Sequence, residues 1–212
     1  MYELYLAPST AGFAPHALLR EIGADFSLRF LDVEAAEHKR PEYLRLNPLG
    51  KIPVLLVDGR PVAETGAILM LLAERHPDAA LAPAVNTAAR QDYLQWMLFL
   101  ANTLHAGLIP YFYPARYTAD PEGADGVKRG AERLAGQWFA HVEEAFSDGR
   151  PYLLGETLSA ADFYLFMLAR WGRHFEAKPS SQPRLGEFMQ RMFTRPSIRD
   201  AFAAEGTTEN FF

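Results

Sequence analysis

The sequence predicts an α+β N-terminal domain, built on a mixed four-stranded sheet with helices, followed by an all-α C-terminal domain. Three observations support this. Short apolar runs of strand length alternate with amphipathic stretches only in the first part of the chain. Residues 78–87, rich in Ala, Pro and Asn, have the composition of a linker. Beyond them only helical periodicity remains. We therefore expect domains at residues 1–77 and 88–212, joined by a linker at 78–87.

The first part contains an alternation of strand and helix signals. The expected strands are residues 2–6, 28–33, 54–57 and 61–63, and the expected helices are residues 14–22 and 67–75. Asp58-Gly59 is a hairpin signal between the last two strands. Leu28 and Phe30 are expected to be packed in the second strand. His76-Pro77 ends the second helix. This order fits a small mixed sheet with helices packed on it.

The second part reads as helices. They are expected at residues 88–106, 126–146, 159–173 and 184–193. Ser159 is the expected N-cap of the third, and Asp162 stands at its third helical position. Each side chain can reach the backbone N–H of the other residue, which is a capping box with Asp in place of Glu. This structural role for Asp162 is preferred to a catalytic one, because a helix start explains both polar residues together.

Composition and charge exclude several classes of function. The net charge of −5 argues against a nucleic-acid partner. No apolar run is long enough to span a membrane, and no basic-then-apolar leader is seen, so a cytoplasmic location is expected. The absence of cysteine excludes disulfides, thiolate metal sites and a thiol nucleophile of the protein's own. The six histidines lack metal-ligand spacing, and no GxGxxG motif supports a nucleotide cofactor.

Three motifs in order carry a resemblance to a known family. They are NPLGKIPVLL from Asn47, ETGAIL from Glu64 and the SAAD capping box from Ser159. With this spacing the chain resembles the cytosolic glutathione transferases over essentially its whole length. APHALLRE from Ala14 and LHAGLIP from Leu104 resemble the bacterial beta class. The resemblance implies a thioredoxin-like N-terminal domain and glutathione as co-substrate, with no other cofactor and no metal.

The first two motifs supply the expected glutathione-binding residues. The resemblance implies that Pro53 follows a cis bond and that the backbone of Ile52 pairs with the cysteinyl backbone of glutathione. Taken alone, Pro53 could equally begin an edge strand. Thr65 lies where a helix begins, so its hydroxyl and the exposed N–H groups can bind a carboxylate, while Glu64 can bind an ammonium. The γ-glutamyl end of glutathione carries both charges on one carbon. A simple helix cap would explain Thr65 but not Glu64.

The glycine carboxylate of glutathione requires a cation. Lys51 and His38 are the candidates, together with Lys39.

The chain departs from the beta class where that class has its cysteine. The matching residue is Ala11, and the serine that often follows is Gly12. Ser9 and Thr10 are the remaining hydroxyls near the expected position of the sulfur, and Tyr5 on the first strand is a third candidate. Backbone N–H groups at residues 10–12 are a further alternative.

The helical part carries the expected second-substrate site. His105 matches a beta-class histidine and is a candidate catalytic residue, although it can equally be a satisfied surface histidine. An asparagine of the beta class is replaced by Leu98. Several aromatic residues are candidates for an apolar cleft that binds a hydrophobic electrophile: Phe99, Tyr111, Phe112, Tyr113, Tyr117 and Trp171. The terminal Phe211 and Phe212 are expected to dock back on the protein.

The leading hypothesis is an enzyme that ionises bound glutathione and adds it to a hydrophobic electrophile. Alternatives are a cysteine-independent disulfide reductase or peroxidase that uses glutathione, an isomerase of the maleylacetoacetate type, and a non-catalytic glutathione-binding protein. Apolar residues such as Leu71 and Leu98, which do not all fit inside, together with the resemblance, predict a homodimer.

Overall fold

The computed structural model describes residues 1–207; the expectation for Phe211 and Phe212 lies outside them. The chain forms two compact units, each described by itself below. The first unit contains residues 1–82 and the described residues from 192 onward, and the second unit contains residues 83–191. The domain boundaries predicted from the sequence, at residues 1–77 and 88–212, remain a prediction. The compact units differ from them because the last part of the chain groups with the first unit.

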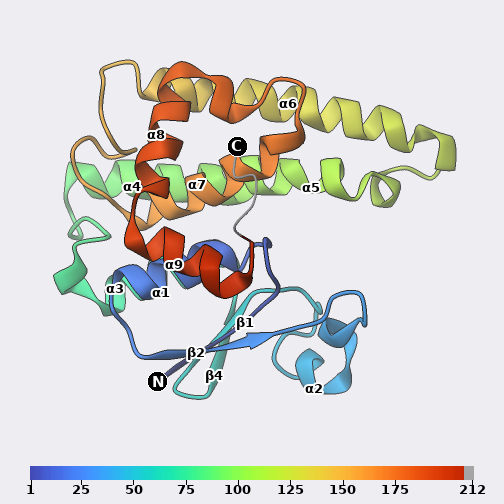
Figure 1. Cartoon of the computed structure of the whole chain (residues 1–212), viewed down its shortest axis with the longest axis horizontal. Coiled ribbons are helices and arrows are strands. Elements are labelled where there is room, and N and C mark those ends of the chain that lie inside the picture. Colours follow the sequence, from blue (N-terminus) through green and yellow to red (C-terminus); the bar gives the residue numbers. More distant parts are fainter. Residues whose placement is uncertain (208–212) are drawn as a thin grey trace. The chain divides into compact units, whose positions relative to one another are not determined.

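The first unit is built on a four-stranded mixed sheet in the order β2-β1-β3-β4. Its strands are β1 (Tyr2–Leu6), β2 (Phe26–Phe30), β3 (Val54–Val57) and β4 (Arg60–Ala63), labelled in part in Figure 1. β1 runs parallel to β2 and antiparallel to β3, which is antiparallel to β4. Asp58 and Gly59 both have positive φ, 51° and 81°, as a tight hairpin turn requires.

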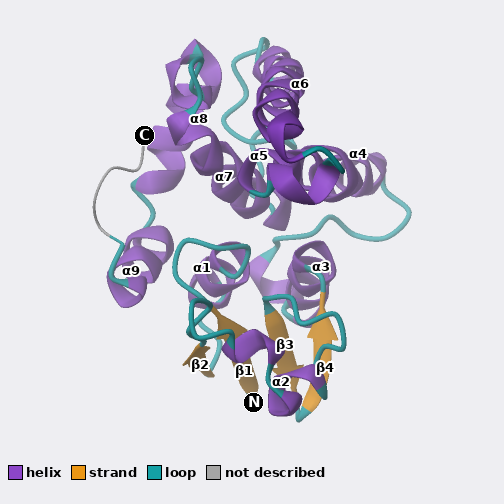
Figure 2. Cartoon of the chain, turned by 90° about the vertical axis from the view of Figure 1, so that its right-hand side faces the viewer, coloured by secondary structure: helices purple, strands orange, loops and turns teal. Residues whose placement is uncertain are grey.

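Helices cover the two faces of this sheet. Figure 2 shows α1 (Phe13–Glu21) and α3 (Thr65–Arg75) on one face and the short α2 (Pro41–Leu44) on the other. Alternate residues of a strand point to opposite faces. Accordingly, Leu4 and Leu6 are fully buried, whereas the ring of Tyr5 lies 6.0 Å from the ring of Tyr43 in α2. Two single turns of 3-10 helix, Glu37–Lys39 and Pro77–Ala79, complete the first 82 residues.

The expected position of the second strand was wrong by about two residues. β2 pairs only with β1, in a register that places Tyr2 opposite Phe26 and Leu6 opposite Phe30. The strand therefore ends where its partner ends, although apolar residues continue beyond it. Phe30 was expected to be packed, but it is 45% exposed because β2 lies at the sheet edge.

A last helix that the sequence analysis did not predict, α9 (Pro196–Glu205), belongs to the first unit. Its local signals are Pro196 in the first turn and Gly206 beyond the end, with φ of 65°. It packs on α1, where the ring centroids of Phe13 and Phe202 are 4.3 Å apart. Arg195 and Ser197 also donate hydrogen bonds to the carboxylate of Glu21.

The second unit is helical. Its α-helices are α4 (Ala88–Leu98), α5 (Ala106–Phe112), α6 (Ala124–Ala145), α7 (Ala160–Trp171) and α8 (Pro183–Phe193). The expected helix at 88–106 does not end there. Residues Phe99–His105 form a π-helical segment that leads directly into α5. A side chain at Gly107 would come 2.0 Å from the ring of Trp138, so glycine lets α5 approach α6 closely. Among residues 1–207, no helix is long and apolar enough to cross a membrane.

The predicted capping box at the start of α7 is confirmed. The fully buried carboxylate of Asp162 accepts hydrogen bonds from the N–H of Ser159 at 2.7 Å and from the N–H of Leu153 at 2.9 Å. Burial raises the pKa of Asp162 to about 6, and these hydrogen bonds oppose the rise. Asp162 therefore ties the preceding loop to the helix start, which is a structural role.

Replacing Asp162 by alanine is expected to lower the free energy of unfolding by about 2–6 kcal/mol, because two buried N–H groups each lose an acceptor worth about 1–3 kcal/mol. Urea unfolding followed by circular dichroism measures the change. Asp148→Ala is the matched control, since Asp148 binds Arg150 on the exposed surface and its loss should have little effect. Equal stability of the two variants would contradict this role for Asp162.

Candidate active site

Strand register brings three segments of the first unit to one end of the sheet. Val54 is paired with Tyr5 on one side and with Ala63 on the other. Continuing the two ladders places the turn after β1, the loop before β3 and the start of α3 next to one another. Thr65 connects two of these segments directly, because its hydroxyl donates a 3.2 Å hydrogen bond to the carbonyl of Ala11. The predicted residues Ser9, Thr10, Ile52, Pro53, Glu64 and Thr65 all belong to these segments.

The turn after β1 leaves few donors available. Ser9 is half-buried with φ of 62°, and the hydroxyl of Thr10 donates to the carbonyl of Ala7 at 2.7 Å. The proton of the Thr10 hydroxyl is thus already used within the turn. The N–H of Ala11 has no acceptor among residues 1–207. A Cβ atom on Gly12 would lie 2.5 Å from Leu6 Cβ, so glycine allows α1 to begin against β1.

A buried carboxylate of α9, that of Glu205, binds the backbone of this turn. Glu205 accepts a 2.9 Å hydrogen bond from the N–H of Ser9 and a 2.8 Å bond from Nδ1 of His16. The tautomer of His16 follows from Arg20, whose Nε donates to His16 Nε2 at 2.9 Å. Because Nε2 accepts a hydrogen bond, the ring proton of His16 is on Nδ1, and Nδ1 donates the hydrogen bond to Glu205. The sequence analysis missed Glu205 and His16, whose positions 189 residues apart give no local signal of their pairing.

The loop before β3 is held by its carbonyl groups. The ammonium of Lys39 donates to the carbonyl of Gly50 at 2.7 Å, so this candidate cation is engaged within the loop. Tyr43 and Asn47 both donate to the carbonyl of Lys51. The Ile52–Pro53 peptide bond is cis, as expected. Within the described chain, neither the backbone of Ile52 nor the ammonium of Lys51 has a hydrogen-bond partner.

The remaining two first-unit candidates differ in their surroundings. His38 is half-buried in the 3-10 turn beside the loop, where its carbonyl lies 2.9 Å from the position of a Cβ on Gly50. Tyr5 points to the α2 face of the sheet, whereas Leu6 lies against the start of α1 on the other face. Burial raises the pKa of Tyr5, which keeps its hydroxyl protonated at neutral pH.

The start of α3 combines an exposed carboxylate with free backbone donors. Glu64 has φ of 70°, an unusual conformation for a residue with a side chain. Its carboxylate is exposed and has no partner among the described residues. In the same part of the chain, the N–H groups of Thr65, Gly66 and Ala67 have no acceptor. A positive φ at an exposed acidic residue is the kind of backbone strain that clusters at functional sites.

The candidates in the second unit lie among aromatic rings. Nδ1 of His105 is 2.7 Å from the hydroxyl of Tyr164, and its ring is 5.0 Å from that of Trp171. Tyr111 is only 8% exposed, so this expected cleft residue lies in the core of its unit. Phe112 and Tyr113 are 39% and 46% exposed and remain candidates for contact with a ligand.

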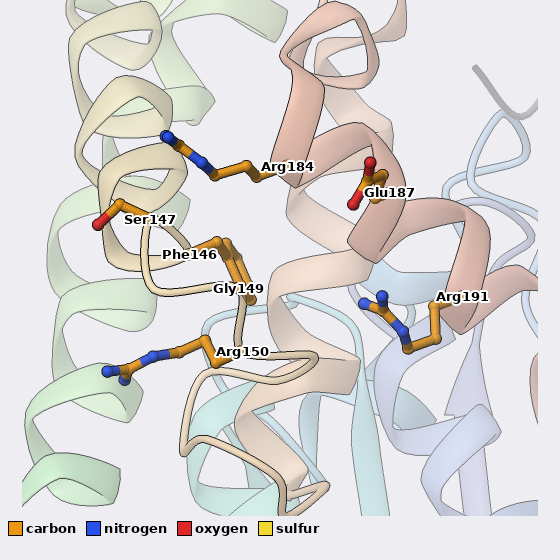
Figure 3. Close-up of a pocket in the computed structure, with 7 residues that line it drawn as sticks. All are labelled: Phe146, Ser147, Gly149, Arg150, Arg184, Glu187 and Arg191. Atoms are coloured by element: carbon orange, nitrogen blue, oxygen red, sulfur yellow. The ribbon is translucent and has the colours of Figure 1, made fainter.

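A pocket of ≈ 90 Å³ in the second unit holds none of the predicted residues. Figure 3 shows its lining, which is Phe146, Ser147, Gly149, Arg150, Arg184, Glu187 and Arg191. Its positive charges are largely compensated. Arg150 binds both carboxylate oxygens of Asp148, and Arg184 lies 3.6 Å from the carboxylate of Glu143. We therefore do not assign it an anion-binding role.

Comparison with known proteins agrees with this arrangement. Family models described as "Glutathione S-transferase, N-terminal domain" and "Glutathione S-transferase, C-terminal domain" match residues 2–74 and 99–196. Glutathione S-transferase GstA of Escherichia coli O157:H7 is 32% identical over 206 residues, which cover 96% of this chain and 98% of that protein. Glutathione S-transferase GST-4.5 of Xanthomonas campestris is 31% identical, with 96% and 98% covered.

Solved structures show the same relationship. A glutathione transferase homologue from Sulfitobacter with bound glutathione has a TM-score of 0.89 and 29% identity, and the match covers 98% of this chain and 99% of that one. The beta-class glutathione S-transferase of Sphingomonas chungbukensis has a TM-score of 0.85 and 32% identity, with 97% and 100% covered. The chain therefore belongs to the glutathione S-transferase family.

Proposed function

We propose that this protein is a glutathione transferase that binds glutathione at the end of its first-unit sheet, ionises the thiol and adds it to a hydrophobic electrophile. One observation carries the proposal. The backbone of Ile52, the carboxylate of Glu64 and the N–H groups that begin α3 have no partner within residues 1–207, and they belong to segments that meet at one end of the sheet. These groups complement a short peptide that carries an amino-acid ammonium and carboxylate at one end.

Each part of glutathione has a suitable partner. The γ-glutamyl carboxylate binds the N–H groups at the start of α3, and its ammonium binds Glu64. The cysteinyl backbone pairs with Ile52 like an added strand, with Pro53 next to it. Lys51 neutralises the glycine carboxylate, because its ammonium is exposed and unengaged within residues 1–207, and His38 is the second candidate. The structure of the Sulfitobacter homologue contains bound glutathione, which supports glutathione as the ligand.

The thiol is ionised without a cysteine of the protein. An ordinary thiol has a pKa of about 8.5, and lowering it by about two units requires roughly 2.7 kcal/mol of preference for the anion. A hydrogen bond to a charged group supplies about 1.5–3 kcal/mol. The start of α1 adds about 0.3–1 kcal/mol. The Ser9 hydroxyl and the Ala11 N–H are the proposed donors. Thr10 is the second hydroxyl candidate, and its hydroxyl donates to the carbonyl of Ala7.

The reaction then needs little more from the protein. The thiolate sulfur forms a bond to an electrophilic carbon, the displaced group leaves with its electron pair, and the thiol proton passes to solvent. In the second unit, Phe112 and Tyr113 are the proposed apolar contacts for the electrophile, with His105 as a polar group beside it.

We also propose a homodimer, since the apolar side chain of Leu98 is 57% exposed. Sedimentation as a monomer at micromolar concentration would contradict this.

The proposed function is tested with a panel of substrates beside calorimetry of glutathione binding. We expect glutathione binding and turnover of an aryl halide such as chlorodinitrobenzene. Turnover only of a mixed disulfide or an organic hydroperoxide would instead identify a cysteine-independent reductase or peroxidase. Binding without turnover of any of the three would identify a non-catalytic glutathione-binding protein.

Replacing Glu64 by glutamine is expected to weaken glutathione binding about tenfold to one hundredfold, because a hydrogen bond to the ligand ammonium loses its charge. Thermal stability should not change, since Glu64 has no partner in the described chain. Calorimetry measures the affinity, and Glu34→Gln, at an exposed residue of the same unit, is the control. Thr65→Val should lower stability as well as affinity, since it also removes the bond to Ala11. Wild-type affinity of Glu64→Gln would place the ammonium elsewhere.

Replacing Ser9 by alanine is expected to raise the pKa of bound glutathione by about one unit, because the thiolate loses a hydrogen bond. Thiolate absorbance against pH gives the pKa directly. Ser27→Ala on β2 changes the same hydroxyl away from the turn and should titrate like the wild type. If Ser9→Ala also titrates like the wild type, the backbone N–H of Ala11 and the start of α1 hold the thiolate.

A further inference from the structure

The carbonyl of Lys51 receives two side-chain hydrogen bonds from the interior of the first unit. The hydroxyl of Tyr43 donates at 2.7 Å and Nδ2 of Asn47 donates at 2.8 Å. Both donors are almost fully buried, with 4% and 6% of their surfaces exposed. The other end of the Asn47 side chain accepts from the N–H of Leu49 at 3.1 Å, which fixes the orientation of its amide. The Lys51 carbonyl is therefore held in one direction.

This direction determines where the next N–H points. A trans peptide is planar, and its C=O and N–H point to opposite sides. The Lys51–Ile52 bond is not among the cis bonds of the described chain. With the Lys51 carbonyl held toward Tyr43 and Asn47, the N–H of Ile52 must point away from them. Within residues 1–207 that N–H meets no acceptor.

We propose that Tyr43 and Asn47 are positioning residues for glutathione, which hold the Lys51–Ile52 peptide plane so that the Ile52 N–H points at the cysteinyl carbonyl of the ligand. The inference rests on the proposed function and adds two residues that do not touch the ligand. Without these donors, rotation of the peptide plane turns the N–H away, and part of the binding free energy is spent on ordering it again.

The hydroxyl of Tyr43, not its ring, carries this role. A phenylalanine would fill the same buried volume, yet the chain has a phenol whose only described hydrogen bond is to the Lys51 carbonyl. Burial strongly raises the pKa of Tyr43, so the hydroxyl keeps its proton and stays a donor across the physiological range. The preceding carbonyl, that of Gly50, is held in the same way by Lys39. Two successive carbonyls of the loop, those of Gly50 and Lys51, are therefore fixed by side-chain hydrogen bonds.

The test uses two variants and two ligands. Tyr43→Phe removes only the hydroxyl, and Asn47→Asp removes the donor while keeping the acceptor for Leu49. The ligands are glutathione and an analogue in which a trans alkene replaces the cysteinyl–glycine peptide bond, so that the cysteinyl carbonyl is absent. Tyr2→Phe is the matched control: it also removes a buried phenol of the first unit, one bonded to His76 at 2.9 Å.

Calorimetry should show glutathione binding weakened about threefold to tenfold in Tyr43→Phe and in Asn47→Asp, with wild-type affinity in Tyr2→Phe. The alkene analogue should bind both variants as it binds the wild type, since it makes no bond to the Ile52 N–H. The amide resonance of Ile52 should also shift less on glutathione binding in Tyr43→Phe than in the wild type.

Three results would overturn the proposal. Wild-type affinity of a folded Tyr43→Phe for glutathione would show that the hydroxyl does not position the peptide. An equal loss for both ligands would show a general structural role. Failure of the wild type to bind glutathione would overturn the proposed function together with this inference, which distinguishes the two. If Asn47→Asp does not fold, Tyr43→Phe decides alone.

Discussion

The antiparallel pairing of β1 with β3 is the constraint on which the site depends. Because Tyr5 pairs with Val54, and Val54 also pairs with Ala63, the ends of three strands lie at the same end of the sheet. The turn, the loop and the helix that follow these strands must begin there. The three segments of the site are far apart in sequence, and strand register brings them together.

The backbone part of the candidate site consists of N–H and C=O groups that have no hydrogen-bond partner within residues 1–207. Inward-pointing carbonyls and N–H groups find buried partners: Glu205 binds the Ser9 N–H, and Tyr43 and Asn47 bind the Lys51 carbonyl. Buried polar groups must be paired in this way. The N–H of Ala11, the backbone of Ile52 and the first three N–H groups of α3 have no partner within residues 1–207. A peptide ligand can complete their hydrogen bonding.

The proposed thiolate site requires no cysteine of the protein. Ala11 stands where the beta class resembled here usually has cysteine, so the side chain supplies nothing to a thiolate. Its backbone N–H, however, lies just before α1 and has no acceptor in the described part of the chain. A donor of this kind depends on the turn geometry and not on the residue type. The buried carboxylate of Glu205 holds that turn by accepting the hydrogen bond of the Ser9 N–H.

The sequence by itself determined the elements whose causes are local. Short apolar runs placed β1 and β3, the Asp58-Gly59 pair placed the hairpin between β3 and β4, and Ser159 with Asp162 placed the start of α7. The NPLGKIP and ETGAIL motifs indicated Ile52, Pro53, Glu64 and Thr65. Only the tertiary structure decided where β2 ends, that α9 belongs to the first unit, and that Glu205 binds the Ser9 N–H while Tyr43 and Asn47 bind the Lys51 carbonyl. Each of these depends on partners distant in the chain or on the directions of peptide planes, which side-chain periodicity does not encode.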